Sequence, residues 1–306
     1  MQVLLTRGRG FSLLEMIIVV VLLGIVGAAI GGFILPAVRA YQAQGQRAAL
    51  VDAGESALRR LARDVRISLP NSLRITNTGS GFALEMVPTA DGARYCTTGV
   101  ADCSSGNVLT IGSSDNQFDV LGCFQNASFT GSPAGYRLVI GDSSGQFYSA
   151  AGTSAVATPT STTISLSIFP GTGGTPTQCG TASATANSYN RYRLTLTAGQ
   201  TFPNASSRQR VFVVQSSALP VSYICDTTAQ TLTRYSGYTV QATQPTTAAA
   251  IGAATTAVVA TSLTACSLTS TTTDVQSTGL LTLTLGLTRA GETVQLMHQV
   301  QLDNSL

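Results

Sequence analysis

The chain has 306 residues, of which 44% are hydrophobic and 10% are charged, so it has the length for one large domain or two small ones. All 17 basic residues are arginines, and the net charge of +3 falls to +1 without the two arginines of the first ten residues (3 − 2 = 1). These values exclude a disordered tail and leave no basic field for nucleic acid, so no nucleic-acid partner is expected.

A long apolar segment follows the basic N-terminus, running from Phe11 to Leu35 with Glu15 as its only charge. As a helix it would be about 37 Å long, enough to span a bilayer. A secretory signal has a shorter apolar region, about 7–15 residues, with a small-residue cleavage site after it. Here the small, basic "RGRG" comes first. Hydropathy alone favours an ordinary signal anchor, and flanking arginines on both sides leave its orientation undecided.

The boundary between these two regions carries a more specific pattern. Gly10 is followed by Phe11, Ser12 and Glu15, and then by the apolar run. This pattern resembles the prepilin signal of type IV pilins and of the pseudopilins of type II secretion. The resemblance implies that a prepilin peptidase cleaves after Gly10 and that Phe11 is then N-methylated. It also implies that Glu15 acts in assembly, pairing with the N-terminal amine of an adjacent subunit; a glutamate resting at the headgroup boundary is the alternative.

The helical pattern continues beyond the membrane segment. Gly27 and Gly31 form a GxxxG pair that permits close helix approach, and Pro36 is expected to kink or locally open the helix. Pro70 is expected to end it. Residues at three- and four-residue spacing predict a packing face made of Val51, Gly54, Leu58, Leu61, Val65 and Leu69. The charged residues around this face are expected to be solvated: Asp52, Glu55, Arg59, Arg60, Arg63, Asp64 and Arg66.

After Pro70 the composition changes to Ser, Thr, Gly and short β-rich runs. Alternation over Leu281–Leu287 and Val294–Leu302 predicts a final hairpin around "TRAGET". The other predicted strands are Phe82–Val87, Val108–Ile111, Tyr136–Ile140, Thr163–Phe169, Tyr192–Thr197, Arg210–Gln215 and Val221–Cys225. Segments 152–162, 171–190 and 242–262 are rich in Thr, Ala, Ser and Gly and are expected to be surface loops.

Chemistry-bearing residues are sparse. The single histidine, His298, falls in the apolar phase of the last strand and is expected to be half-buried rather than catalytic. No catalytic residue, cofactor site or metal site is proposed by the sequence, and we expect no enzymatic activity. Six cysteines beyond a membrane span fit disulfides, with fifteen possible pairings. We predict Cys225–Cys266, Cys96–Cys103 and Cys123–Cys179.

Three stretches carry a narrower resemblance, to the O-type minor pilins of mannose-sensitive haemagglutinin (MSHA) pilus systems. They are "ALRRLARDVRISLPNSLRI" (57–75), "PVSYICD…LTRYSGY" (220–238) and "VQLMHQVQLDNS" (294–305), and the middle of the chain adds no support. The head is also large for a pilin, which suits a minor subunit near the filament tip. The resemblance implies partners in prepilin peptidase, other minor and major pilins, and the inner-membrane assembly platform.

The sequence therefore predicts an α+β pilin architecture with a cleaved leader (1–10), a transmembrane helix (11–35), an amphipathic helix (36–69) and a β-rich head (70–306). We expect a single-pass inner-membrane protein with its head in the periplasm, later incorporated into a pilus on the cell surface. Two alternatives stay open. One is a J-type minor pseudopilin of type II secretion; the other is a membrane-anchored periplasmic binding domain or enzyme that never polymerises.

Overall fold

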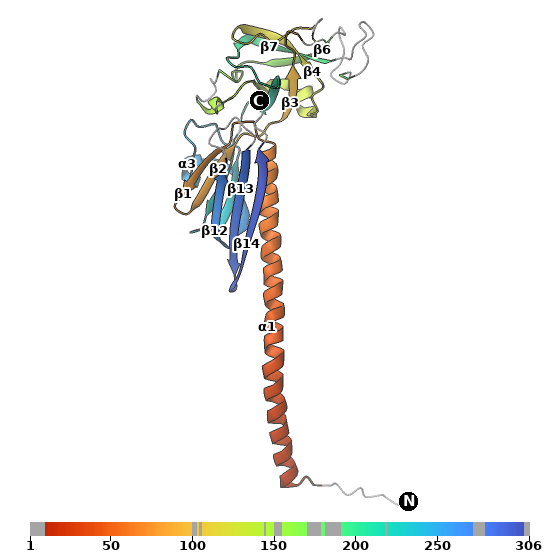
Figure 1. Ribbon diagram of the computed structural model, residues 1–306, viewed down its shortest axis with the longest axis vertical. Helices are drawn as coiled ribbons and strands as arrows, with labels where there is room; N and C mark the ends of the chain where they lie inside the picture. The colour runs from red at the N-terminus through yellow and green to blue at the C-terminus, as the bar shows by residue number, and fades with distance from the viewer. Residues whose placement is uncertain are drawn as a thin grey trace, which may run out of the picture.

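A computed structural model describes residues 10–99, 103, 106–143, 145–149, 155–169, 179–180, 191–217, 220–271 and 279–302. A long helix carries a β-rich head at its C-terminal end (Figure 1). All of the strand pairings in the described residues are antiparallel. The predicted α+β class, a long apolar helix followed by an antiparallel β head, is confirmed.

Helix α1 (Leu13–Arg66) is continuous over 54 residues. It passes through Pro36 without a break, so the expected local opening does not divide it. It ends before Pro70, because Ile67 already caps the helix and Ser68 turns the chain through a hydrogen bond to the Val65 carbonyl (3.2 Å). The helix therefore stops three residues short of the predicted end at Leu69.

The helix-proximal lobe packs along the upper part of α1 (Figure 1). Its five-stranded sheet has the order β1-β2-β9-β10-β11, and a three-stranded sheet has the order β12-β13-β14. The strands are β1 (Arg74–Thr78), β2 (Gly81–Met86), β9 (Val221–Asp226), β10 (Thr231–Ser236), β11 (Thr255–Thr261), β12 (Leu263–Ser270), β13 (Gly279–Arg289) and β14 (Glu292–Leu302), with the short helix α3 (Ala248–Ile251) before β11. The buried face of α1 and the inner faces of both sheets share one apolar core.

The distal lobe is formed by the chain between β2 and β9, and it lies beyond the C-terminal end of α1 (Figure 1). Its six-stranded sheet has the order β5-β8-β3-β4-β7-β6 and a separate apolar core. The strands are β3 (Asp91–Tyr95), β4 (Ser114–Leu121), β5 (Tyr136–Val139), β6 (Ile164–Phe169), β7 (Arg191–Thr201) and β8 (Arg210–Gln215), and the short helices are α2 (Ala127–Gly131), η2 (Pro133–Gly135) and η3 (Gln146–Tyr148). Within the predicted single head, the described strands thus form two lobes.

A third apolar cluster joins the two lobes. Leu69 and Val87, at the end of the helix-proximal lobe, pack with distal residues that include Phe147 and Tyr148. The Tyr148 hydroxyl donates a hydrogen bond to the Ser72 carbonyl (2.9 Å). The two lobes therefore share apolar packing and a hydrogen bond at the C-terminal end of the helix.

The predicted final hairpin is present as β13 and β14, which are joined through Ala290 and Gly291 with positive φ values of 51° and 83°. Six of the other predicted strands overlap strands in the structure. These are β2, β5, β6, β7, β8 and β9. Residues Val108–Ile111 form no strand, because hydrogen bonds from Leu109 to Cys96 and from Thr110 to the Asp115 side chain hold them as a connection.

The expected loop 242–262 contains α3 and β11, so that prediction is wrong over Ala248–Ile251 and over Thr255–Thr261, which pairs with β10. Of the other two expected loops, residues 152–154, 171–178 and 181–190 lie outside the described residues. Residues 155–162 form turns, with Ala157 bridging to Val139.

Candidate functional site at the N-terminus of the helix

The residues predicted for processing lie at the exposed start of α1. Gly10 and Phe11 precede the helix without regular secondary structure and are solvent-accessible, and Phe11 keeps 77% of its surface exposed. Ser12 is the N-cap, with φ −80° and ψ 150°, and its Oγ accepts a hydrogen bond from the Glu15 backbone N–H (3.2 Å). The cap satisfies one of the free N–H groups of the first turn, so the helix begins at Leu13, two residues beyond Phe11.

Glu15 lies in the first turn of α1, one helical turn from Phe11, and is exposed. Its carboxylate forms no hydrogen bond or ion pair with any described residue of its own chain. The N-terminus of a helix carries about half a positive charge, which favours a carboxylate there. A free amine on Phe11 would add a full charge at the same place. Glu15 is thus positioned to meet a cation from its own terminus or from another chain.

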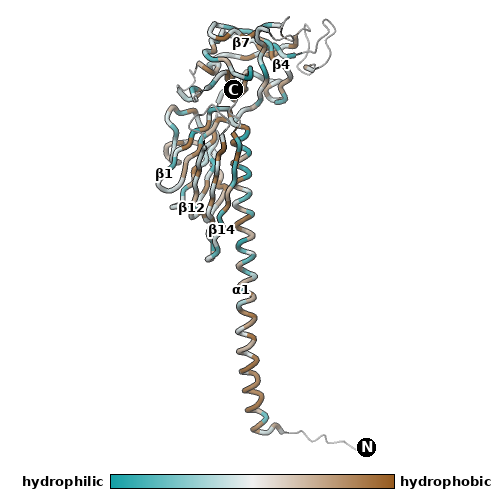
Figure 2. Tube along the Cα trace, in the orientation of Figure 1, coloured by the Kyte–Doolittle hydropathy of each residue, from teal (hydrophilic) through white to brown (hydrophobic). Residues whose placement is uncertain are grey.

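The lower half of α1 has an uncovered apolar surface (Figure 2). The helix passes the length and hydropathy test for a membrane span, with a mean hydropathy of 2.9 over an 18-residue window that is 0% buried. Large apolar side chains from Phe11 to Val38 are exposed around the whole circumference of the helix. Exposure of this continuous apolar surface to water is energetically unfavourable. We therefore expect lipid or other apolar helices to cover it.

Glycines within this surface pack against no other segment among the described residues. A Cβ atom built on Gly24, Gly27, Gly31 or Gly32 would meet nothing within 4 Å. A glycine inside a helix costs about 0.5–1 kcal/mol relative to alanine. The described chain offers no contact to offset this cost, whereas close approach of a second helix would.

The upper half of α1 uses its apolar face to hold the helix-proximal lobe. Gly54, Leu58, Leu61 and Val65 are buried as predicted, and Val51 is half-buried. Most of the surrounding charges are exposed, including the ion pair between Arg59 and Glu55 one turn apart. At the lower end of the lobe, Arg47 pairs with Glu292 at the tip of the β13–β14 hairpin.

Asp64 is the exception, and its predicted solvent exposure is wrong. It is 7% exposed and accepts hydrogen bonds from the Tyr223 hydroxyl and from Arg234 Nε, both at 2.8 Å. Burial raises the pKa of Tyr223, and the hydrogen bond to Asp64 raises it further, so the phenol stays protonated as a donor. Position 64 falls between Leu61 and Val65 in the helical repeat, which was the signal for its burial.

A second buried carboxylate, Glu85 on β2, was not singled out by the sequence. Arg74 Nε and the Tyr238 hydroxyl each donate to it at 2.8 Å, and Tyr238 shares a 2.6 Å hydrogen bond with Ser222. Burial raises the pKa of Glu85, and the Arg74 charge partly opposes that shift. The Arg74 guanidinium also lies 3.7 Å from the centre of the Tyr148 ring, which links this network to the distal lobe.

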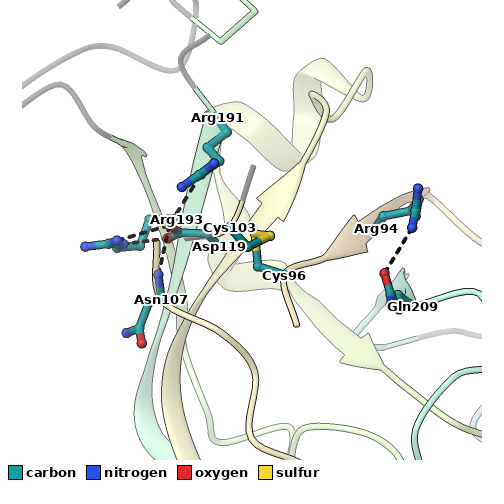
Figure 3. Close-up of a disulfide and its surroundings, with 8 residues drawn as sticks. All are labelled: Arg94, Cys96, Cys103, Asn107, Asp119, Arg191, Arg193 and Gln209. Atoms are coloured by element: carbon teal, nitrogen blue, oxygen red, sulfur yellow. Dashed lines mark hydrogen bonds and ion pairs between the residues drawn. A yellow bond between two sulfur atoms is a disulfide. The ribbon is translucent and has the colours of Figure 1, made fainter. Parts of the chain in front are cut away.

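A third buried carboxylate, Asp119 on β4, lies in the distal lobe (Figure 3). Arg193 Nε donates to Asp119 Oδ1 at 2.6 Å, and Arg191 Nε lies 3.4 Å from Oδ2. The Asn107 backbone N–H also donates to Oδ2 (3.1 Å). None of these three networks contains an arrangement of nucleophile and base, so we assign them to holding the head together.

The three disulfides join the predicted pairs. Their sequence separations are 7 for Cys96–Cys103, 56 for Cys123–Cys179 and 41 for Cys225–Cys266. The last one links β9 of the five-stranded sheet to β12 of the three-stranded sheet. His298 is half-buried, as expected. Among the described residues no group of three His, Cys, Asp or Glu side chains is placed to hold a metal ion.

Comparison with known families gives one match. Residues 5–31 match the family described as the prokaryotic N-terminal methylation motif. Neither the curated proteins nor the solved structures contain a match to the chain. The motif and the uncovered helix together support a membrane-anchored subunit of the type IV pilin and pseudopilin class. The motif implies processing by prepilin peptidase and assembly with other pilins.

Proposed function

We propose that the chain is a minor pilin that acts in the assembly or priming of an MSHA-type type IV pilus and is incorporated near the filament tip. The observation that carries this role is the distal lobe, which lies beyond the end of α1 rather than beside it (Figure 1). If subunits pack through parallel, staggered α1 helices, this lobe occupies space above its own helix. A subunit of this shape fits the end of a filament better than its repeating body.

In this proposal Gly10 and Phe11 are the cleavage and methylation positions, and Glu15 is the assembly residue. Gly10 and Phe11 are exposed and lie ahead of the Ser12 cap, so the bond between them is outside the helix and accessible to the peptidase. The head remains in the periplasm until the subunit enters the pilus. The function is structural, so no catalytic step is assigned to the chain.

Mass spectrometry of the mature N-terminus tests the processing step. Protein recovered from membranes of cells that contain the prepilin peptidase should begin at N-methylated Phe11. A Gly10→Val variant should keep Met1, because a branched side chain at this position obstructs the peptidase, whereas Gly8→Val serves as a control in the same leader. An intact Met1 terminus on the wild-type protein would refute the proposal.

The J-type pseudopilin of type II secretion is the second candidate, since it shares the N-terminal motif. The three stretches that resemble O-type minor pilins favour the pilus. Deletion of the gene in its own host separates the two roles: loss of surface pili with normal export of hydrolases supports the proposal. Loss of secretion with normal pili would assign the chain to the secretion system, and loss of neither would favour a subunit that does not polymerise.

A further inference from the structure

One face of the six-stranded sheet of the distal lobe covers the distal core. The other face packs on the interlobe cluster at β5 and β8, through Val139, Phe212 and Val214, and is mainly polar along β3, β4 and β7. Side chains alternate between the faces of a strand, and residues directly opposite each other on paired strands share a face. Tyr95, Val120 and Leu194 belong to the face that covers the distal core. The registers Arg94↔Arg210, Arg94↔Leu121 and Asp119↔Arg193 place these residues together on the other face.

Arg94 and Arg210 are directly opposite each other on β3 and β8, and both are exposed. No carboxylate in the described part of the chain pairs with either guanidinium. Like charges at directly opposed positions of an antiparallel pair are unfavourable. Folding of the lobe therefore gains nothing from placing these two charges opposite each other, and an anion between them would remove the repulsion.

Hydrogen bonds order the turn next to this pair of arginines. Gln209 has a positive φ of 56°, and its side-chain oxygen accepts a hydrogen bond from Arg94 Nη2 at 3.0 Å (Figure 3). The Arg210 backbone N–H donates to Ser206 Oγ at 2.8 Å, and the Ser206 N–H donates to the Tyr95 hydroxyl at 3.0 Å. These bonds fix the backbone of the turn and the direction of Arg94.

The same face carries a second group of arginines beyond β4. Arg191 and Arg193 both lie against Asp119, and the Arg193 side chain keeps 22% of its surface exposed. The Cys96–Cys103 disulfide lies between this cluster and Arg94 (Figure 3). The arginines therefore form two separate cationic positions along one face, an arrangement suited to a polymer with repeated negative charges.

We propose that this face of the distal lobe binds an acidic polysaccharide, through ion pairs of Arg94 and Arg210, and secondarily Arg193, with carboxylates on the polymer. The presence of arginine rather than lysine at these positions does not indicate a particular ligand, because the chain has no lysine. The described aromatic rings on this face do not provide the open stacking surfaces that single-stranded nucleic acid uses. Phe169 is covered by the Arg193 guanidinium at 3.9 Å, and Phe212 packs against the interlobe cluster, so neither is open for base stacking.

The test measures binding of the full chain in detergent to polygalacturonate, with dextran as the neutral probe. We expect binding to polygalacturonate that weakens as salt rises, and none to dextran. Arg94→Gln/Arg210→Gln should weaken binding at least tenfold. Arg60→Gln/Arg63→Gln on α1 removes the same charge from another exposed surface and should leave binding within twofold of wild type.

Two further variants separate charge from folding. Arg94→Lys/Arg210→Lys should retain most of the affinity, and Arg210→Gln alone should weaken binding without lowering the thermal midpoint, since it removes a like-charge pair. Equal weakening by the α1 pair, equal binding to dextran, or tighter binding to single-stranded DNA or to phosphatidylglycerol vesicles than to polygalacturonate would each overturn the proposal. None of these results depends on cleavage at Gly10 or on filament assembly, so the outcome is independent of the proposed function.

Discussion

Gly54 of α1 and Leu296 of β14 approach so closely that a Cβ atom on residue 54 would overlap Leu296 Cδ1 and lie 3.1 Å from Leu287 Cδ1. The glycine thus lets the helix lie directly on the β13–β14 hairpin. Gly54→Leu should lower stability by about 1–3 kcal/mol through overpacking. Thermal unfolding of the detergent-solubilised chain, followed by circular dichroism, measures the change. Gly45→Leu is the control, since that position is open, and should be neutral or stabilising by up to about 1 kcal/mol.

The hydrogen bonds of Asp64 predict a second loss of stability. Asp64→Asn removes the charge that Arg234 faces in a largely buried setting, and a hydrogen bond to a charged group contributes about 1.5–3 kcal/mol. We expect destabilisation of that size in the same unfolding assay. Asp52→Asn, an exposed acid on the same helix, should change stability by less than about 0.5 kcal/mol. Equal effects of the two substitutions would contradict the assigned role of Asp64.

Glu85 predicts a pH dependence. Its pKa is raised in the folded state, so the folded state binds more protons than the unfolded state between the ordinary pKa of 4.5 and the raised value. Glu85 therefore contributes less stability as pH rises through that window. The unfolding free energy of the wild type minus that of Glu85→Gln should fall from pH 4 towards pH 7. A difference that stays constant or increases would show that Arg74 outweighs burial.

The Cys225–Cys266 disulfide closes a longer loop than Cys96–Cys103 does. Its removal should therefore lower the free energy of unfolding by more than removal of Cys96–Cys103. With separations of 41 and 7 residues, the chain-entropy model gives about 4 and about 2 kcal/mol. Paired Cys→Ser variants measured by thermal unfolding test this order. Alkylation of unreduced, denatured periplasmic protein should find no free thiols, and labelling of all six cysteines would contradict the disulfides.

Glu15→Leu tests assembly separately from membrane insertion. The substitution makes the span more apolar, so the protein should still enter the membrane and be cleaved. It should fail to cross-link to co-expressed pilins, because the attraction between the carboxylate and a neighbouring amine is lost. Arg63→Ala should do less, since an exposed charge pair contributes only about 0–1 kcal/mol. Wild-type cross-linking and pilus numbers for Glu15→Leu would remove the assembly role from this residue.

Local patterns in the sequence predicted the helix, its buried stripe and the final hairpin, because each depends on residues a few positions apart. Leu281, Leu283, Leu285 and Leu287 alternate strictly, and their burial follows from that period alone. The N-terminal pattern likewise depends on adjacent residues. The division into two lobes depends instead on which strands pair: β3 and β4 are polar and weakly patterned, and β9 must pair with β2 from far along the chain.

The buried carboxylates were missed for a related reason. Glu85 is the only charged residue of β2, and its partners Arg74 and Tyr238 are brought to it by strands and connections distant in sequence. A single sequence gives no local sign that these three side chains meet. Arg94 and Arg210 also come together only through the register of β3 and β8.

Met86 and Val221 are register partners at the ends of β2 and β9, so the whole distal lobe leaves and re-enters the sheet at one pair of opposed residues. Neighbouring strands are about 4.8 Å apart, a gap that a two-residue turn can close. The lobe is therefore an insertion at a single point of the sheet, and its length does not set the register of β2 with β9. Changes far from the interlobe contacts can alter the distal surface of the subunit while the sheet that packs on α1 keeps its pairing.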